Sequence, residues 1–269
     1  MEHTSHLAEE AAKLTLEELR AEREKVGDHT EDGRSHGLLP EARTQQFAHD
    51  GLAKMPPDER QGIHVPRILR LVQYDSGSGY IVMEYVPGKT LEHIHREHQD
   101  MTPEDSQPYY DAISRALRLF LAIPVPADAQ PGPVGGGIIH HALFKGFVAP
   151  IKYDSVDMLE KHMNKLATLL NDAAPTVTLE RDLHLVFSDL HMGNFLFTEH
   201  GDLYVVDFDH ASLLPLSFMA FTLGFPSTMS CRVAARIEKD FDLPQENFKV
   251  MLRVSSHFER GTRKIGLPL

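Results

Sequence analysis

The most informative stretch reads Val186-Phe187-Ser188-Asp189-Leu190-His191-Met192-Gly193-Asn194-Phe195, and Tyr204-Val205-Val206-Asp207-Phe208-Asp209 follows it after a Gly-Asp turn. Its apolar residues predict a strand, a loop, a second strand, a turn and a third strand. A hairpin of this kind returns the chain beside its own start. We therefore expect Asp189, Asn194 and Asp207 to lie close together.

The spacing of these three residues suits one reaction. Asp189 and Asn194 form the D-x-x-x-x-N pattern of a phosphotransferase catalytic loop. A carboxylate at Asp189 can accept the proton of an attacking hydroxyl. An amide oxygen at Asn194 and a carboxylate at Asp207 are hard donors that can hold Mg²⁺ against nucleotide phosphates. The pattern thus predicts Asp189 as the catalytic base, Asn194 and Asp207 as metal ligands, and ATP with Mg²⁺ as cofactors.

Two other interpretations of the segment are open. The acidic residues can be incidental on a solvated hairpin. Alternatively, an acidic and histidine-containing cluster can form a two-metal hydrolase site. That cluster would comprise Asp189, His191, Asp207, Asp209 and His210. The hydrolase interpretation gives no role to Asn194, so the phosphotransferase interpretation is favoured.

Composition narrows the classes of partner. The 269 residues are 42% hydrophobic and 25% charged, as in an ordinary soluble globular protein. Lys and Arg number 27 and Asp and Glu number 39, which gives a formal net charge of −12. Such a balance argues against a nucleic-acid partner and against adhesion to an anionic membrane. We expect a nucleotide and a small-molecule acceptor as partners, and the sequence predicts no oligomeric state.

Cysteine usage and apolar runs bear on location. Cys231 is the only cysteine, so no internal disulfide can form and a reducing compartment is expected. Residues 1–20 are acidic and lack the apolar core of a secretory signal. The longest apolar stretch, 213–225, is shorter than the roughly 20 residues of a membrane-spanning helix. We therefore expect a cytoplasmic protein.

Periodicity predicts a hairpin followed by helices. Two segments rich in Val, Ile, Leu and Tyr, residues 65–74 and 80–86, flank a Gly- and Ser-rich turn, which indicates a β-hairpin. Apolar residues at 3–4 residue spacing predict helices elsewhere. These helices are expected over residues 7–25, 41–54, 91–98, 103–124 and 155–171, with a further helix near the C-terminus.

The sequence also resembles a known family. It is similar to the aminoglycoside-phosphotransferase/choline-kinase-like branch of the protein-kinase-like fold, and in particular to fungal members of unassigned substrate. The resemblance covers about residues 41–267. Besides the catalytic loop, its matching stretches are Glu41–Ala48, Gly79–Gly88, Pro131–Gly137 and Ser212–Phe218.

The resemblance implies an α+β fold of two lobes, with a reduced N-terminal lobe and a mainly helical C-terminal lobe. The implied division is an N-terminal helix and linker (residues 1–36), a reduced small lobe (37–88) and a large catalytic-type lobe (89–269). Backbone groups near Glu84 and Val86 would bind adenine. Glu41 would open the helix that carries the ion-pair partner of a phosphate-binding lysine.

The chain departs from the family pattern in its small lobe. Upstream of Glu41 it shows neither a G-x-G-x-x-G loop nor a V-x-K strand. Lys13 and Lys25 lie in a helical pattern, and Lys25 is the better-placed candidate for the missing cation. Two functions from different classes follow. One is a Mg-ATP-dependent kinase acting on a small-molecule hydroxyl, and the other is a pseudokinase that binds a ligand or partner without transferring phosphate.

Two further patterns are interpreted as plain structure. The glycines of Gly135-Gly136-Gly137 follow two prolines and lack a following Lys-Ser/Thr, so they predict a loop rather than a phosphate cradle. The pair His140-His141 is expected on the surface of the loop that follows.

Overall fold

The structure is a computed structural model that describes residues 38–73, 79–169 and 171–258, together with Lys13, Thr15, Glu17 and Glu18. Most of the helix expected over residues 7–25, the linker after it and the candidate cation Lys25 lie outside the described residues.

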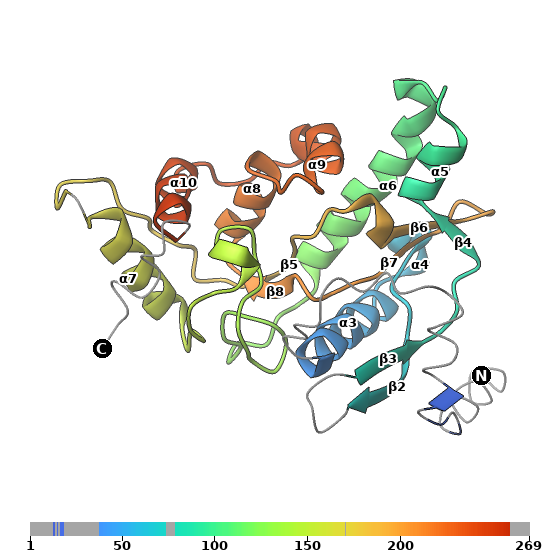
Figure 1. Cartoon of the computed structure of the whole chain (residues 1–269), viewed down its shortest axis with the longest axis horizontal. Helices are drawn as coiled ribbons and strands as arrows, with labels where there is room; N and C mark the ends of the chain where they lie inside the picture. Colours follow the sequence, from blue (N-terminus) through green and yellow to red (C-terminus); the bar gives the residue numbers. More distant parts are fainter. Residues whose placement is uncertain are drawn as a thin grey trace.

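The helices and strands follow in chain order (Figure 1). The α-helices are α3 (Leu38–Ala53), α4 (Pro57–Arg60), α5 (Leu91–Glu97), α6 (Pro103–Ala122), α7 (Val156–Ala167), α8 (Leu216–Gly224), α9 (Cys231–Ile237) and α10 (Phe248–His257). The strands are β1 (Ile63–His64), β2 (Ile68–Gln73), β3 (Gly79–Met83), β4 (Gly88–Thr90), β5 (His184–Phe187), β6 (Phe195–Thr198), β7 (Leu203–Val205) and β8 (Ala211–Leu214). Short 3₁₀ turns lie at Lys145–Phe147, Met192–Asn194 and Glu238–Asp240.

The N-terminal part is built from α3 and the antiparallel hairpin β2–β3, as the sequence predicts. Gln45 and His49 of α3 tie the helix to the chain that enters the hairpin. Gln45 Nε2 donates to the carbonyl of Pro66 at 2.9 Å, and a ring nitrogen of His49 lies 2.8 Å from the carbonyl of Val65. These hydrogen bonds fix the position of α3. They use the carbonyls of Val65 and Pro66, which precede β2 and are not paired within the hairpin.

A four-stranded sheet joins distant parts of the chain in the order β1-β7-β6-β4. Strands β6 and β7 form the expected hairpin, with Phe195 opposite Val205. Strand β1 runs parallel to β7, and β4 runs antiparallel to β6. The sequence pattern predicts neither β1 nor β4, because strands of two or three residues are too short to show a periodicity.

The C-terminal part is mainly helical, as expected. Helix α6 begins at a capping box, in which Thr102 and Asp105 exchange side-chain and backbone hydrogen bonds. At the centre of the core, the rings of Phe120, Phe187 and Phe208 pack against one another with centroids 5.2–6.0 Å apart. Phe208 lies between Asp207 and Asp209 in sequence, so its burial anchors both carboxylates to the core.

The long apolar stretch over residues 213–225 divides into two elements. Strand β8 pairs antiparallel with β5, and Pro215 then precedes α8. Among the helices that the structure describes, none combines the length and the apolar character needed to cross a bilayer.

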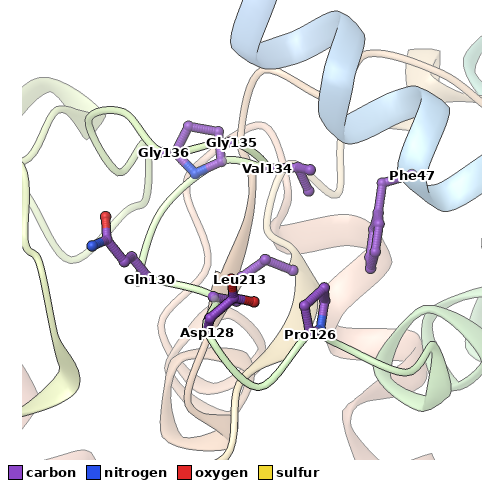
Figure 2. A pocket seen from close by; sticks show the side chains of 10 residues that line it. Phe47, Pro126, Asp128, Gln130, Val134, Gly135, Gly136 and Leu213 are labelled. Atoms are coloured by element: carbon purple, nitrogen blue, oxygen red, sulfur yellow. The ribbon is translucent and has the colours of Figure 1, made fainter.

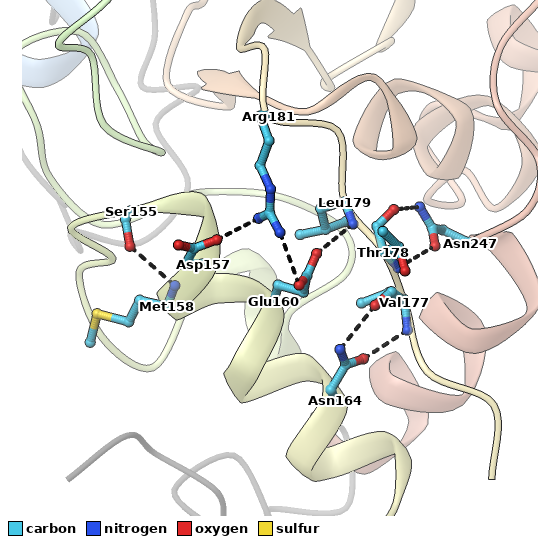
Figure 3. Close-up of polar contacts among 10 residues, drawn as sticks. All are labelled: Ser155, Asp157, Met158, Glu160, Asn164, Val177, Thr178, Leu179, Arg181 and Asn247. Carbon is cyan, nitrogen blue, oxygen red and sulfur yellow. Dashed lines mark hydrogen bonds and ion pairs between the residues drawn. The ribbon is translucent and has the colours of Figure 1, made fainter.

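Side chains from α7 and from the residue before α10 hold the segment that leads into β5 (Figure 3). Asn164 of α7 accepts from the Val177 N–H at 2.7 Å and donates to the Val177 carbonyl at 2.9 Å. Asn247, which precedes α10, makes the same paired contact with Thr178, at 3.0 and 2.8 Å. Glu160 accepts from the Leu179 N–H at 2.7 Å. Hydrogen bonds of this kind contribute roughly 1 kcal/mol each, and together they position the strand that presents Asp189.

Candidate active site

Asp189 and Asn194 are joined in the loop between β5 and β6. The Asn194 side chain is 6% exposed, and its Nδ2 donates to Asp189 Oδ2 at 3.0 Å and to the Asp189 carbonyl at 3.1 Å. The Asn194 carbonyl accepts from the Val206 N–H at 3.0 Å, which ties the loop to the end of β7. Because Nδ2 is used on Asp189, Oδ1 is the Asn194 atom that suits a metal.

Asp207 follows β7 in a conformation that L-residues rarely adopt. Its φ is +63°, in the left-handed region, which costs a non-glycine residue of order 1–3 kcal/mol and is concentrated at functional sites. The pKa of Asp207 is raised, first by burial and then by the negative charges of Asp189 and Asp209. Asp207 is nevertheless an exposed residue, so solvent reaches the site at this point.

The structure therefore brings together the three residues that the catalytic-loop pattern singles out. Asn194 contacts Asp189 directly, and the charge of Asp189 acts on Asp207. The convergence follows from the antiparallel return of β7 beside β6. Their chemical roles stay predictions.

Glu41 faces the same carboxylates from the first turn of α3. Its pKa is raised to about 8, first by burial and then by the charges of Asp207 and Asp209. Three acidic side chains from two segments, the start of α3 and the residues after β7, thus contribute to one strongly negative region. A cation near them would lower the free energy of the charged carboxylates.

The two predicted adenine-binding positions lie just beyond β3. The Glu84 N–H donates to the Arg67 carbonyl at 3.0 Å, and the Val86 carbonyl accepts from the Gly88 N–H at 2.9 Å. These two groups are therefore engaged within the protein. The Glu84 carbonyl and the Val86 N–H are the backbone groups to consider for adenine. Between them, the side chain of Tyr85 is 87% exposed.

The expectation that His140 and His141 lie on a loop surface is wrong. His140 is 6% exposed and His141 is completely buried. The segment closes on itself, with the Ala149 N–H donating to the Ile139 carbonyl at 2.9 Å, and so turns both imidazoles inward. Burial lowers the pKa of His141 to about 3, and its Nε2 lies 2.9 Å from Thr222 Oγ1. The apolar residues on both sides of this pair were the available signal.

His140 belongs to the site region, which the sequence analysis missed. Its Nδ1 lies 3.1 Å from Asp209 Oδ1, and Nε2 of His210 lies 3.7 Å from Asp209 Oδ2. In contrast, Nδ1 of His191 accepts from the Gly193 N–H at 3.2 Å, within its own turn. The histidines near the acidic residues are therefore grouped differently from the two-metal hydrolase cluster considered from sequence.

The Gly-rich segment after residue 131 is a loop, as predicted, and it lines a cavity of about 270 Å³ (Figure 2). Phe47, Pro126, Val134 and Leu213 supply apolar walls, and Asp128 supplies a carboxylate.

The three consecutive glycines of this loop have φ angles of +82°, +82° and +151°, which accounts for glycine at these positions. Two cationic side chains reach the loop: a Cβ at Gly135 would lie 3.1 Å from an Arg43 nitrogen, and one at Gly136 would lie 3.4 Å from Lys152 Nζ.

Comparisons with solved structures return aminoglycoside phosphotransferases at low similarity. The apo form of a thermostable mutant of aminoglycoside phosphotransferase APH(4)-Ia is 13% identical, with a TM-score of 0.45 over 84% of this chain and 80% of that chain. AMP-bound spectinomycin phosphotransferase APH(9)-Ia is 14% identical, with a TM-score of 0.42 over 85% of this chain and 76% of that chain. A search of curated proteins finds no match.

A family model gives the decisive comparison. The model described as the phosphotransferase enzyme family matches residues 33–223, which is more than half of the chain. The matched range contains α3, the β2–β3 hairpin and the loop that carries Asp189 and Asn194. The chain belongs to the phosphotransferase enzyme family.

Proposed function

We propose that this protein is a Mg-ATP-dependent phosphotransferase that acts on a hydroxyl of a small molecule. Membership of the phosphotransferase family supports the reaction class. The observation that carries the finer proposal is the contact between Asn194 and Asp189 beside Asp207, because it joins a base to two oxygen donors. The implied division into residues 1–36, 37–88 and 89–269 is part of the same proposal.

Asp189 is the proposed catalytic base. Its Oδ2 is held by Asn194, so the carboxylate presents a fixed orientation to the acceptor hydroxyl and can take the proton as the oxygen attacks. Most of the rate in this chemistry comes from positioning the reactants and stabilising charge. A carboxylate fixed by a buried amide meets the first requirement.

The proposed metal ligands fit Mg²⁺ by their chemistry. Asn194 Oδ1 and the Asp207 carboxylate are hard oxygen donors, the class that Mg²⁺ prefers. Mg²⁺ held by these two side chains would supply positive charge to offset the negative charge of the nucleotide phosphates. Asp207 lies directly after β7 in a strained backbone conformation. The preceding Val206 N–H donates to the Asn194 carbonyl and so links the segments that carry the two proposed ligands.

The nucleotide and the acceptor would occupy opposite sides of this centre. Adenine would bind along the segment after β3, at the Glu84 carbonyl and the Val86 N–H. The net charge of −12 and the acidic residues of the site favour a cationic or polyhydroxyl acceptor.

A coupled assay of ADP release tests the proposal. The intact protein would be assayed with Mg-ATP over a panel of amino sugars, amino alcohols and polyols. We expect acceptor-dependent release that Asp189→Asn lowers by roughly 10²-fold or more. Asp172→Asn changes an exposed acid after α7 and serves as the matched control. Equal rates for the Asp189 variant and the parent would refute the role of Asp189.

One observation favours the pseudokinase alternative. Within the described residues, the charges that act most strongly on Glu41 are the carboxylates of Asp207 and Asp209, whereas the family resemblance implies a lysine near the helix that Glu41 begins. The absence of such a cation lowers the rate of phosphoryl transfer by roughly 10²–10⁴-fold. We therefore expect this chain to transfer phosphate slowly. Lys25→Ala should lower it further if Lys25 supplies the cation, with Lys13→Ala as control. Mg-dependent ATP binding with no turnover for any acceptor would favour the pseudokinase.

A further inference from the structure

The geometry points to a second cation site in this protein, a transition-metal site formed by His140, Asp209 and His210. One ligand atom from each of these side chains lies within 4.8 Å of the other two. The site is distinct from the oxygen-only pair of Asn194 and Asp207. It goes beyond the proposed phosphotransferase function and does not depend on it.

The three side chains come from two segments that the fold brings together. Asp209 and His210 follow β7, whereas His140 lies 69 residues earlier, at the base of the loop over residues 139–149. Asp209 stands between the imidazoles, with Oδ1 3.1 Å from His140 Nδ1 and Oδ2 3.7 Å from His210 Nε2. The two rings are nearly perpendicular, with centroids 5.9 Å apart.

These separations suit a small divalent ion. Zinc lies about 2.0–2.1 Å from nitrogen and oxygen ligands, so ligand atoms around a tetrahedral ion are roughly 3.3 Å apart. The 3.1 Å separation of His140 Nδ1 and Asp209 Oδ1 is close to that value, and His210 Nε2 lies 3.7 Å from the other oxygen of the same carboxylate. The ligand atoms of the two imidazoles lie within 4.8 Å of each other, so binding one ion requires a shift of the His210 ring, whose side chain is 26% exposed. The Asp209 side chain is 39% exposed and gives the ion a route from solvent.

The donor chemistry selects the class of metal. Two imidazoles and a carboxylate favour Zn²⁺ and neighbouring transition metals, whereas Mg²⁺ prefers oxygen ligands alone. The molecule would therefore hold two different cations at neighbouring positions. Asp207 and Asp209 are separated in sequence by Phe208, whose side chain is completely buried.

The protein holds His210 in place from two sides. Its ring stacks on Phe147 at a centroid distance of 5.2 Å. Phe147 has a φ of +62°, an unusual conformation for a bulky residue that the loop nevertheless keeps. The His210 carbonyl accepts from Ser188 Oγ at 2.7 Å and from the Ser188 N–H at 3.2 Å. Ser188 precedes Asp189, so the proposed site is fixed to the catalytic loop.

The charge of the region also favours a cation. Asp209 acts on both Asp207 and Glu41, so a positive ion beside Asp209 would offset repulsion among three carboxylates. The alternative is that His140 and Asp209 form a hydrogen-bonded pair that binds no metal. The two hypotheses predict different affinities for zinc.

Zinc titration of the full-length, metal-free protein tests the site. Zinc alone is the ligand, a chromophoric chelator reports free zinc, and millimolar Mg²⁺ is present throughout to occupy oxygen sites. We expect one equivalent of tightly bound zinc, and His140→Ala and His210→Ala should each weaken it at least tenfold. The matched control is His93→Ala, because His93 also lies 3.1 Å from a carboxylate, that of Glu97, on the exposed face of α5.

Two further measurements control for misfolding of the variants and for zinc binding at another site. Zinc should raise the Tm of the parent protein and of His93→Ala, and it should leave the Tm of His210→Ala unchanged. Because His210 is partly exposed, its replacement should leave the circular-dichroism spectrum intact. The proposal is overturned if the parent binds no zinc, if the histidine variants bind it as tightly as the parent, or if Asp207→Asn removes the zinc while His140→Ala and His210→Ala keep it.

Discussion

The side-chain amide of Asn194 is hydrogen-bonded to Oδ2 of Asp189 at 3.0 Å, so the two residues of the D-x-x-x-x-N pattern act on each other directly. One amide group orients the proposed base through its nitrogen and leaves its oxygen for a metal. The proton-accepting and metal-holding parts of the site are therefore coupled through one buried side chain.

This coupling predicts different outcomes for two substitutions at Asn194. Asn194→Ala removes both functions and should lower kcat by roughly 10²–10³-fold. Asn194→Asp keeps an oxygen ligand but places a second carboxylate against Asp189, so it should bind Mg²⁺ and still turn over slowly. Rates measured against Mg²⁺ concentration separate the two effects. Asn171→Ala, at an exposed turn, is the control, and a parent-like rate for Asn194→Ala would refute the coupling.

The left-handed backbone of Asp207 predicts an unusual order of stability. Asp207→Gly should be more stable than Asp207→Ala by about 1 kcal/mol, because glycine adopts a φ of +63° without a Cβ clash. Both variants should lose Mg-dependent nucleotide binding. Urea unfolding gives the stabilities, and calorimetric titration with Mg-ATP gives the binding. An alanine variant as stable as the glycine variant would show that the backbone conformation is not strained.

The raised pKa of Glu41 predicts that the free energy of unfolding depends on pH when Mg²⁺ and nucleotide are absent. Its pKa in the folded protein is about 8, above the ordinary value of 4.5, so the folded state binds the proton more tightly. The resulting stability is complete below about pH 4.5 and is lost as the pH rises through about 8. Between these limits the parent should lose roughly 1–3 kcal/mol relative to Glu41→Gln.

Urea unfolding at several pH values checks the Glu41 prediction. Glu104→Gln, in the exposed first turn of α6, is the matched control and should follow the parent. Identical pH profiles for Glu41→Gln and the parent would show that the Glu41 carboxyl titrates as an ordinary exposed acid. A site cation near Glu41 should flatten the parent profile, because it stabilises the charged carboxylate.

The contacts of Asn247 with Thr178 test how strongly the segment that leads into β5 is stabilised. Asn247→Ala leaves the N–H and carbonyl of Thr178 without their side-chain partners, at a cost of roughly 2–4 kcal/mol. For a chain of this size the Tm should fall by about 4–12 °C. Asn171→Ala again serves as control in a thermal melt monitored by circular dichroism. A Tm within a degree of the parent would mean that water replaces both contacts without loss.

Local patterns were sufficient for the elements that position the site. The side chains of Thr90 and Ser155 cap α5 and α7, each accepting from the backbone N–H of the third residue beyond. The β6–β7 hairpin forms because its partners are adjacent in sequence and joined by a tight turn. These features depend on hydrogen bonds and side-chain periods within a few residues, and the sequence contains that information directly.

The sequence by itself determined the family resemblance, the α+β composition, the β2–β3 hairpin and the grouping of Asp189, Asn194 and Asp207. Only the tertiary structure decided that Glu41 faces Asp207, that β1 and β4 complete the central sheet, and that His140 lies against Asp209. Each of these pairs residues far apart in the chain, and two-residue strands or single histidines carry no period that identifies a distant partner. Their placement depends on how the buried apolar faces pack together, and that packing is a property of the whole fold.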